Sequence, residues 1–343
     1  MSFLIRQTLI YAVPLMIVAL AGVFAERSGV INLALEGIMI FGAFIGVIFV
    51  RMLQNKGLFD AAKEAGSWMT LQGYLLLAML VSAIFGAIFS LLLAFAAINL
   101  KADQTIGGTA LNMLAPALVL FLIRIIAKQN TLLLVSGDSA TWFMIKKSTL
   151  GIDKSVDLGV LGEALLNKVY LTTYVCLLVF IILSIILYKT RFGLRLRSCG
   201  ENPQASDSLG INVVKMRYIG VMISGALAGM GGFVFSVTTA NCSANGDVAG
   251  FGFLALAVMI FGNWKPLTIA GGSLLFGLFK CIAACYSTLD INGDGIFALS
   301  QLGISAHFYR LLPYIITLVV LAFTSKSSRA PKAEGIPYDK GLR

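Results

Sequence analysis

The sequence predicts an all-α integral membrane protein, a polytopic bundle of about eight to ten transmembrane helices in which nine is the best count. Hydrophobic residues make up 58% of the 343 residues and charged residues only 12%, whereas an ordinary soluble domain has about 25% charged residues. The apolar residues are gathered in long uncharged runs, several of which reach the roughly 20 residues that a helix needs to cross about 30 Å of hydrocarbon. The chain is therefore expected to cross a bilayer repeatedly.

Each long apolar run is expected to form a membrane helix. In chain order, the expected helices cover residues 8–24, 31–50, 74–98, 105–126, 170–188, 218–240, 250–262, 266–286 and 308–324. The short segment before Asn263 would cover only about 20 Å as a helix, so it is either tilted and extended or a half-helix. The first helix is expected to be retained, because no small-residue cleavage site ends it before Glu26.

Lysine and arginine are concentrated in two short stretches. Residues 189–217 contain six of them and the tail 326–343 contains five, each against two acidic residues. Loops rich in Lys and Arg stay on the cytoplasmic side of a membrane, so both stretches, and with them the C-terminus, are expected inside the cell. The stretch 287–307 has Asp290 and Asp294 and no Lys or Arg, and is expected outside. The predicted organisation is one transmembrane domain, 1–325, followed by a basic cytoplasmic tail, 326–343.

Glycine is frequent inside the apolar runs and recurs at a spacing of four, as in Gly225 and Gly229. Small residues at this spacing let membrane helices approach closely. A tightly packed bundle with bent helices is therefore expected.

Several kinds of chemistry have no residues to support them. The sequence has no Gly-x-x-x-x-Gly-Lys-Ser/Thr phosphate loop, its single histidine is His307, and its five cysteines show no metal-ligand spacing. The chain is expected to be a transport subunit rather than an enzyme, with no cofactor, metal or nucleic acid bound. Few ionisable residues lie in the apolar runs, which disfavours an ion-coupled transporter or a channel that acts alone. That class is kept as the alternative to a pump driven by a separate protein on the inner face.

The basic loop 189–217 contains the signals of one short helix over about 203–209. Asn202 is a good N-cap, Pro203 suits the first helical position, and Gly210 can adopt the left-handed conformation that ends a helix. The alternative interpretation is an ordinary capped turn in a solvated loop.

This loop and the stretch MRYIGVMISGALAGMGG at 216–232 resemble the permeases of ATP-binding-cassette importers for simple sugars, nucleosides and branched-chain amino acids. The resemblance covers nearly the whole chain. The nucleoside branch in particular is suggested by ERSGVINLALEG at 26–37, KADQTIGGTALN at 101–112 and APKAEGIPY at 330–338, and the shorter GFLALA at 252–257, FGNWKP at 261–266 and LPY at 312–314 add to it.

The resemblance implies a permease subunit in a bacterial plasma membrane that translocates a small solute. A nucleoside is the first expectation, and a simple sugar or a riboflavin-like solute is the runner-up. The implied partners are a cytoplasmic ATPase that uses ATP and Mg, a second identical or homologous permease, and an external substrate-binding lipoprotein. The resemblance also implies that the loop helix couples the permease to the ATPase, through Gly200, Glu201, Asn202, Pro203, Ala205, Leu209 and Gly210.

Six polar residues are candidates for the translocation pathway, namely Asn32, Glu36, Asp103, Gln104, Thr105 and Asn112. If a helix starts near Ser28, Glu36 lies roughly 12 Å into the hydrocarbon with Asn32 one turn before it on the same face. A charge at that depth costs several kcal/mol, so it is expected to be functional or paired. The alternative is that Glu36 braces a helix end or pairs with a Lys or Arg.

The other candidates also have structural alternatives. Asp103 can cap the helix that follows it, and Gly107-Gly108 can break that helix near the pathway. Asn112 lies two turns beyond Thr105 on the same side, where it lines the path or joins two helices by hydrogen bonds. Arg124 and Lys280 are expected near outer helix ends, where long basic side chains reach the membrane surface without a functional role.

Overall fold

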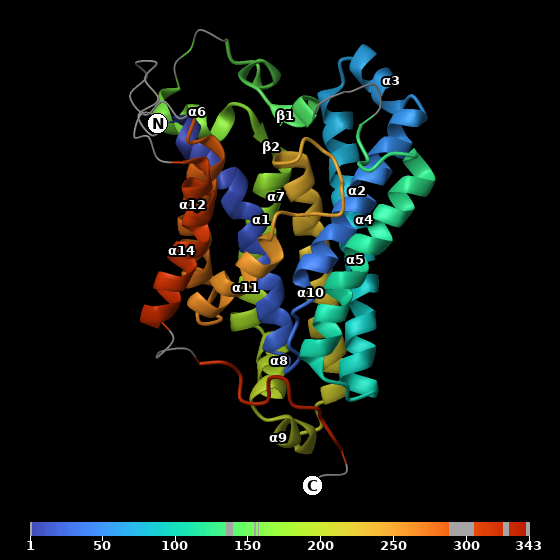
Figure 1. The fold of residues 1–343 in the computed structure, drawn as a ribbon, viewed down its shortest axis with the longest axis vertical. Coiled ribbons are helices and arrows are strands. Elements are labelled where there is room, and N and C mark those ends of the chain that lie inside the picture. The colour runs from blue at the N-terminus through green and yellow to red at the C-terminus, as the bar shows by residue number, and fades with distance from the viewer. Residues whose placement is uncertain are drawn as a thin grey trace.

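Helices expected from the apolar runs form the body of the protein, with irregular connections at both ends (Figure 1). The computed structural model describes residues 2–134, 140–153, 156, 158–287, 305–324 and 329–340. The α-helices are α1 (Ser2–Glu26), α2 (Leu35–Asn55), α3 (Leu58–Glu64), α4 (Trp68–Ala94), α5 (Gln104–Ala127), α6 (Gly159–Leu166), α7 (Leu171–Lys189), α8 (Arg191–Glu201), α9 (Pro203–Ser208), α10 (Val213–Thr238), α11 (Phe251–Phe261), α12 (Pro266–Cys285) and α14 (Ala306–Thr324).

Only short pieces of other secondary structure accompany these helices in the described part of the chain. A π-helical turn, Phe95–Asn99, continues α4, and two 3-10 turns cover Ala140–Phe143 and Lys147–Leu150. The strands β1 (Met144–Ile145) and β2 (Val169–Tyr170) pair antiparallel, with Met144 opposite Tyr170.

All nine predicted segments are helical, which confirms the predicted fold class. Seven helices of the described residues, α1, α2, α4, α5, α7, α10 and α12, are long and apolar enough to cross a membrane. The short segment is also confirmed, since α11 contains only 11 residues. At 1.5 Å per residue, such a helix reaches only about half of the hydrocarbon thickness.

The second predicted helix begins later than expected. A start near Ser28 is wrong, because residues 27–34 are not helical and α2 begins at Leu35. Gly29 has a φ of +95°, and the Asn32 side chain accepts a hydrogen bond from the Ala34 N–H at 3.1 Å. Asparagine that bonds to its own backbone in this way favours a turn over a helix. Asn32 therefore does not lie on a helix face with Glu36.

The basic loop contains two helices where one was predicted. The missed helix, α8, is capped by Thr190, whose Oγ1 accepts a hydrogen bond from the Gly193 N–H at 3.3 Å. Its buried residues Gly193, Leu196, Cys199 and Gly200 recur at helical spacing. Similarly, α10 begins at Val213, five residues before the predicted start, and is capped by Asn212. Polar capping residues thus extend the helices beyond the apolar runs.

The most enclosed helices are α1 and α10, and α10 packs against α1, α2 and α4. Two glycines of α10 make the closest approach to α4. A Cβ at Gly225 would lie 2.6 Å from the Gly86 carbonyl oxygen, and a Cβ at Gly229 would lie 2.5 Å from that of Ser82. The predicted close packing through small residues is confirmed, and α5, α7 and α12 leave most of their surface outside this core.

Candidate functional site: a helix junction inside the bundle and a docking unit at its base

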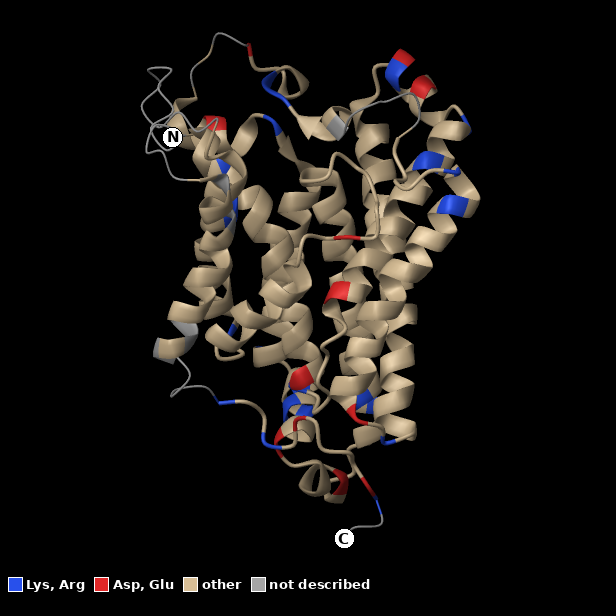
Figure 2. Ribbon diagram, viewed as in Figure 1, with Lys and Arg blue, Asp and Glu red and all other residues tan. Residues whose placement is uncertain are grey.

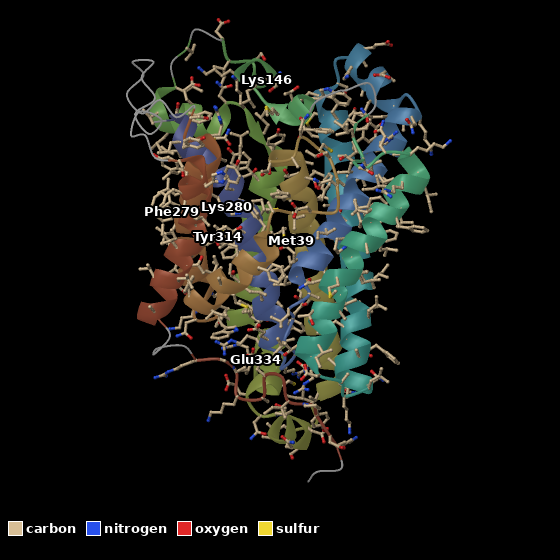
Figure 3. The ribbon with its side chains drawn as sticks, in the orientation of Figure 1. Met39, Lys146, Phe279, Lys280, Tyr314 and Glu334 are labelled. Carbon is tan, nitrogen blue, oxygen red and sulfur yellow. The ribbon has the colours of Figure 1, made fainter. Side chains whose placement is uncertain are left out.

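The non-helical segment 27–34 leads from the end of α1 back into the bundle, where α2 begins. Figure 3 shows Met39, in the first turns of α2, at mid-height of the molecule, while Glu334 lies near its lower end. Non-helical backbone at membrane depth is tolerated only where protein groups or a water-filled cavity satisfy its N–H and C=O groups. The segment 27–34 therefore needs polar partners from neighbouring helices.

Two of the predicted pathway residues, Gln104 and Asn112 of α5, supply such partners, and a third, Asn32, lies in the segment and bonds to α10. The Gln104 Oε1 accepts a hydrogen bond from the Ile31 N–H at 2.7 Å. The Asn112 amide accepts from the Gly37 N–H at 2.8 Å and donates to the Leu33 carbonyl at 2.7 Å. The Asn32 Nδ2 donates to Ser224 of α10 at 2.8 Å. The structure thus brings Asn32, Gln104 and Asn112 together around one segment and gives each a bracing contact.

Glu36 lies where α2 and α11 both begin. Its carboxylate accepts backbone hydrogen bonds from Gly250 at 3.0 Å, Gly252 at 2.5 Å and Phe253 at 3.3 Å, and its side chain is 7% exposed. These N–H groups have no partner within α11, because the first turn of a helix leaves its donors free. The positive end of the helix dipole also favours a carboxylate here. The two structural alternatives for Glu36 were bracing of a helix end and pairing with a Lys or Arg. The structure shows the first, because Glu36 binds the start of α11.

Asp103 and Thr105 lie apart from this junction. The Asp103 carboxylate caps α5 by accepting hydrogen bonds from the Thr105 and Ile106 N–H groups at 2.8 and 2.9 Å, so the predicted cap is confirmed. Thr105 is exposed. The predicted break at Gly107-Gly108 is wrong, because α5 is continuous through both residues. A Cβ at Gly108 would lie 2.9 Å from the Cβ of Leu33, so this glycine allows α5 to approach the segment 27–34.

The predicted loop helix is present as α9. The Asn202 side chain accepts a hydrogen bond from the Ala205 N–H at 3.0 Å, Pro203 occupies the first turn, and Gly210 has a φ of +79°. Leu209 is 81% exposed. The start and stop signals in the sequence are therefore confirmed, and the residue directly after α9 presents a large apolar side chain to the outside of the chain.

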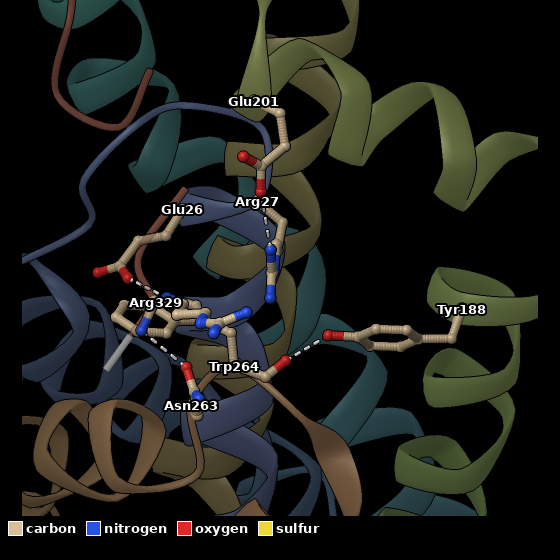
Figure 4. A network of polar contacts seen from close by, with 7 residues as sticks. All are labelled: Glu26, Arg27, Tyr188, Glu201, Asn263, Trp264 and Arg329. Carbon is tan, nitrogen blue, oxygen red and sulfur yellow. Dashed lines mark hydrogen bonds and ion pairs between the residues drawn. The ribbon is translucent and has the colours of Figure 1, made fainter. Parts of the chain in front are cut away.

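A network of polar contacts ties the α8–α9 unit, residues 191–208, to the base of the bundle (Figure 4). Arg27 pairs with Glu201 at 3.2 Å, and the Glu26 carboxylate accepts a hydrogen bond from the Trp264 indole at 2.5 Å. The Tyr188 hydroxyl donates to the Trp264 carbonyl. The ends of α1 and α7 thereby meet the turn between α11 and α12, and the end of α8 is joined to the residue that follows α1.

The described part of the C-terminal tail, residues 329–340, lies against the same base (Figure 1). The Ala333 N–H donates to the Gly200 carbonyl at 2.8 Å, and the Arg217 Nη1 donates to the Ile336 carbonyl at 2.9 Å. Lys101 pairs with Asp339 at 2.6 Å. Sequence reasoning missed Arg217 and Trp264, although a charged residue and a tryptophan next to basic turns are signals that such contacts exist.

A cavity of about 600 Å³ lies beside the junction and contains residues that the sequence did not single out for a function. Lys280 lines it and donates a hydrogen bond to the Ala249 carbonyl at 3.0 Å. Asp247, Phe251 and Tyr314 line the same cavity. The Lys280 ammonium group therefore contacts the loop before α11, and the interpretation of Lys280 as a side chain that only reaches for the membrane surface does not account for this hydrogen bond.

The chain was compared with known proteins. Residues 4–321 match the family described as "Branched-chain amino acid transport system / permease component". The chain is 40% identical to the guanosine ABC transporter permease protein NupQ of Bacillus subtilis (strain 168), over 100% of this chain and 98% of that protein. It is 37% identical to the nucleoside ABC transporter permease protein NupC of Lactococcus lactis subsp. cremoris (strain MG1363), over 99% and 98%.

A more distant relative is the putative glucose ABC transporter permease protein TsgC13 of Haloferax volcanii, which is 27% identical over 94% of this chain and 92% of that protein. No solved structure matches the chain. The family match and both closer similarities extend over nearly all of the membrane helices and the α8–α9 unit. The chain therefore belongs to this permease family and is a membrane-spanning permease subunit of an ABC transporter.

Proposed function

We propose that this chain is the membrane subunit of an ATP-driven importer for nucleosides, and that the α8–α9 unit receives the motion of a separate ATPase. The names of the relatives that are 37–40% identical over nearly the whole chain support the solute class. The coupling role is supported chiefly by one observation. A short helix with a side-chain cap at Asn202 and a left-handed stop at Gly210 projects from the base of the bundle and is joined to the ends of α1 and α8.

A short capped helix suits this task because it transmits a displacement better than a flexible loop. Force on α9 would pass through Glu201 and Arg27 to the end of α1 and to the segment 27–34, which leads to Glu36. At Glu36, the start of α2 is joined to the start of α11. A rocking of α8 and α9 would thus reach the middle of the bundle through contacts between named residues.

The proposed orientation places the α8–α9 unit and the tail in the cytoplasm, because the Lys and Arg residues of both lie at one end of the molecule (Figure 2). Cysteine labelling of intact cells tests this. In a Cys285→Ser background, an impermeant reagent should label Lys146→Cys and should not label Arg197→Cys or Lys332→Cys. The predicted outer position of Ser300 lies outside the described residues.

The proposed assembly contains a cytoplasmic ATPase with its ATP and Mg, a second permease subunit and an external binding lipoprotein. The test is ATP-dependent uptake of radiolabelled guanosine by proteoliposomes that contain the complete importer. Guanosine uptake that needs ATP and the ATPase is the expected result. Uptake by this chain alone without ATP would instead identify a channel or an ion-coupled transporter.

The coupling role is tested with the double substitution Asn202→Ala and Gly210→Val. Loss of the cap costs about 1 kcal/mol, and a left-handed conformation costs a residue with a Cβ about 1–2 kcal/mol. We expect at least fivefold lower ATPase binding or solute-stimulated hydrolysis.

A matched control is Gly57→Val. Gly57 also has a positive φ, of +70°, and no atom lies within 4 Å of its Cβ position, as at Gly210. Gly57 precedes α3 at the other end of the bundle. The control should keep ATPase binding and stimulated hydrolysis. Wild-type values in the double variant would rule out α9 as the coupling helix.

A further inference from the structure

The cavity beside the helix junction is lined by elements far apart in the sequence. Its wall is formed by α1, the end of α10, the loop before α11, and parts of α12 and α14. Figure 3 shows Lys280 and Tyr314 near one another, on the side of the molecule formed by α12 and α14. Phe251, the first residue of α11, follows directly after Gly250, whose N–H is bonded to Glu36. The cavity is therefore adjacent to the proposed coupling path.

Two opposite charges line this cavity without forming an ion pair with each other. The Asp247 Oδ1 accepts a hydrogen bond from the Ala249 N–H at 2.9 Å, and Lys280 donates one to the Ala249 carbonyl at 3.0 Å. Neither takes part in an ion pair within the described residues. An ammonium group has three donors and a carboxylate about four acceptor positions, so both retain capacity for a bound molecule.

Four aromatic side chains, Tyr11, Phe235, Phe251 and Tyr314, also line the cavity. Phe251 lies 4.7 Å from Phe235 between ring centroids, and the Lys280 ammonium lies 4.9 Å from the centre of the Phe251 ring and 5.6 Å from that of Tyr314. The hydroxyl groups of Tyr11 and Tyr314 have no hydrogen-bond partner in the described part of the chain. A flat ring can stack on such side chains, and ring hydroxyls can serve the polar groups of a sugar.

We infer that this cavity is a binding site for the transported solute, in which Asp247 and Lys280 recognise a nucleobase edge with an N–H next to a C=O. The carboxylate would accept from the N–H and the ammonium would donate to the carbonyl oxygen, while the base stacks on the aromatic wall. This inference rests on the proposed function, since it assigns a site to the proposed nucleoside. It predicts a preference for guanosine, inosine and uridine, which have this edge, over adenosine, which lacks it.

The loop that carries Asp247 is held in an uncommon conformation. Ala249 has a φ of +53° and Gly250 one of +71°, and an alanine rarely adopts this region. Residues kept in such conformations by their surroundings gather at ligand sites. Asp247 lies between two of the motifs that resemble the permease family, 216–232 and 252–257, so sequence reasoning gave it no role.

The test measures solute binding by the permease itself, apart from the external binding protein. Thr239 lines the cavity, so a maleimide should label Thr239→Cys in a Cys285→Ser background of the purified importer. Without ATP or binding protein, guanosine should slow this labelling at least threefold, and adenosine and leucine should not. Asp247→Asn and Lys280→Met should each raise the guanosine concentration for half protection at least tenfold, as expected for loss of a hydrogen bond to a charged group.

Two further variants keep the result interpretable. Tyr314→Phe removes only a hydroxyl without a protein partner and should weaken protection a few-fold even if Lys280→Met fails to assemble. Lys146→Met removes an exposed lysine that lies away from the cavity, and it should leave protection unchanged. Protection that survives Asp247→Asn, Lys280→Met and Tyr314→Phe would overturn the inference, as would protection by leucine in place of guanosine. If the wild-type importer takes up no nucleoside at all, the proposed function fails instead.

Discussion

Two buried glutamates, ten residues apart in the sequence, are stabilised in different ways. Glu26 is 4% exposed and Glu36 is 7% exposed. Glu36 accepts three backbone hydrogen bonds at the start of α11, whereas Glu26 accepts one from the Trp264 indole and has a second carboxyl group, that of Glu334, as its neighbour. One carboxylate is thus compensated by fixed backbone dipoles and the other by side chains.

The difference shows which of the two sites can respond to conditions. Backbone N–H groups cannot lose their protons or turn away, so the Glu36 junction is a rigid joint. Glu26 and Glu334 are neighbours at the base of the bundle, and two neighbouring carboxyl groups disfavour the charged form of each other. Burial raises the pKa of Glu334 to about 7. The base of the bundle is therefore the part whose contacts depend on pH.

The largest expected effect is at the rigid joint. A Cβ at Gly252 would lie 2.4 Å from the Glu36 backbone nitrogen and 2.5 Å from its Cα, so Gly252→Ala should push α11 away from α2. Overpacking of this kind costs about 1–3 kcal/mol or more. We expect a lower thermal midpoint of the purified subunit and loss of uptake.

Gly271→Ala is the matched control for this substitution. Gly271 lies inside α12, and no atom lies within 4 Å of its Cβ position. Alanine is favoured over glycine inside a helix by about 0.5–1 kcal/mol, so this variant should be neutral or more stable. Equal midpoints for the two variants would contradict the close contact between α11 and α2.

The next effect is the loss of the acceptor at the same joint. Glu36→Gln places an NH2 group, itself a donor, against backbone donors, and an unsatisfied buried group costs about 1–3 kcal/mol. The thermal midpoint should fall and uptake should fall with the amount of assembled protein, while Glu64→Gln on the exposed side of α3 should change neither. Reduced uptake at unchanged stability would instead place Glu36 in the translocation pathway.

The base should respond to pH. Because the pKa of folded Glu334 is raised to about 7 from an ordinary value of 4.5, its contribution to tail docking is fully present below about pH 4.5 and is lost as the pH rises through about 7. A cysteine at Lys332 should therefore become more reactive with a maleimide between pH 5 and pH 8. The rates are first divided by those of a free thiol at the same pH, which corrects for the pH dependence of the thiolate itself. Glu334→Gln should then abolish the rise in reactivity, and a rise that persists in this variant would refute the role of Glu334.

The smallest expected effect is at the surface ion pair of the base. Arg27 and Glu201 are 3.2 Å apart, and the Glu201 side chain is 46% exposed. Exposed pairs contribute about 0–1 kcal/mol, so Glu201→Gln should change the free energy of unfolding by less than about 1 kcal/mol. A double-mutant cycle with Arg27→Gln measures the coupling energy between Arg27 and Glu201. A value above about 2 kcal/mol would contradict the expectation that this pair contributes as little as an exposed ion pair.

The sequence alone determined the fold class, the approximate positions of the membrane helices and the helix signals of α9. These features depend on local properties. The thickness of the hydrocarbon core sets the length that an apolar run needs to span it, and a capping residue such as Asn202 acts within one helical turn. A break after residue 24 was predicted, but its extension to residue 34 was not. An apolar run shows where a helix is possible but not where its backbone finds partners in Gln104 or Asn112. Helix α8 was not predicted for a similar reason, because its apolar residues are few and are interrupted by arginines.

Only the tertiary structure decided what the polar residues contact. Asn32, Gln104 and Asn112 were singled out as candidates for the translocation pathway, but the sequence did not indicate their partners, which lie up to 192 residues away in the chain. Glu36 meets a helix start at Gly252, and Lys280 shares a cavity with Asp247, through packing of α11 and α12 that no local pattern encodes. Burial makes a polar group require a partner, and long-range packing chooses which partner it is.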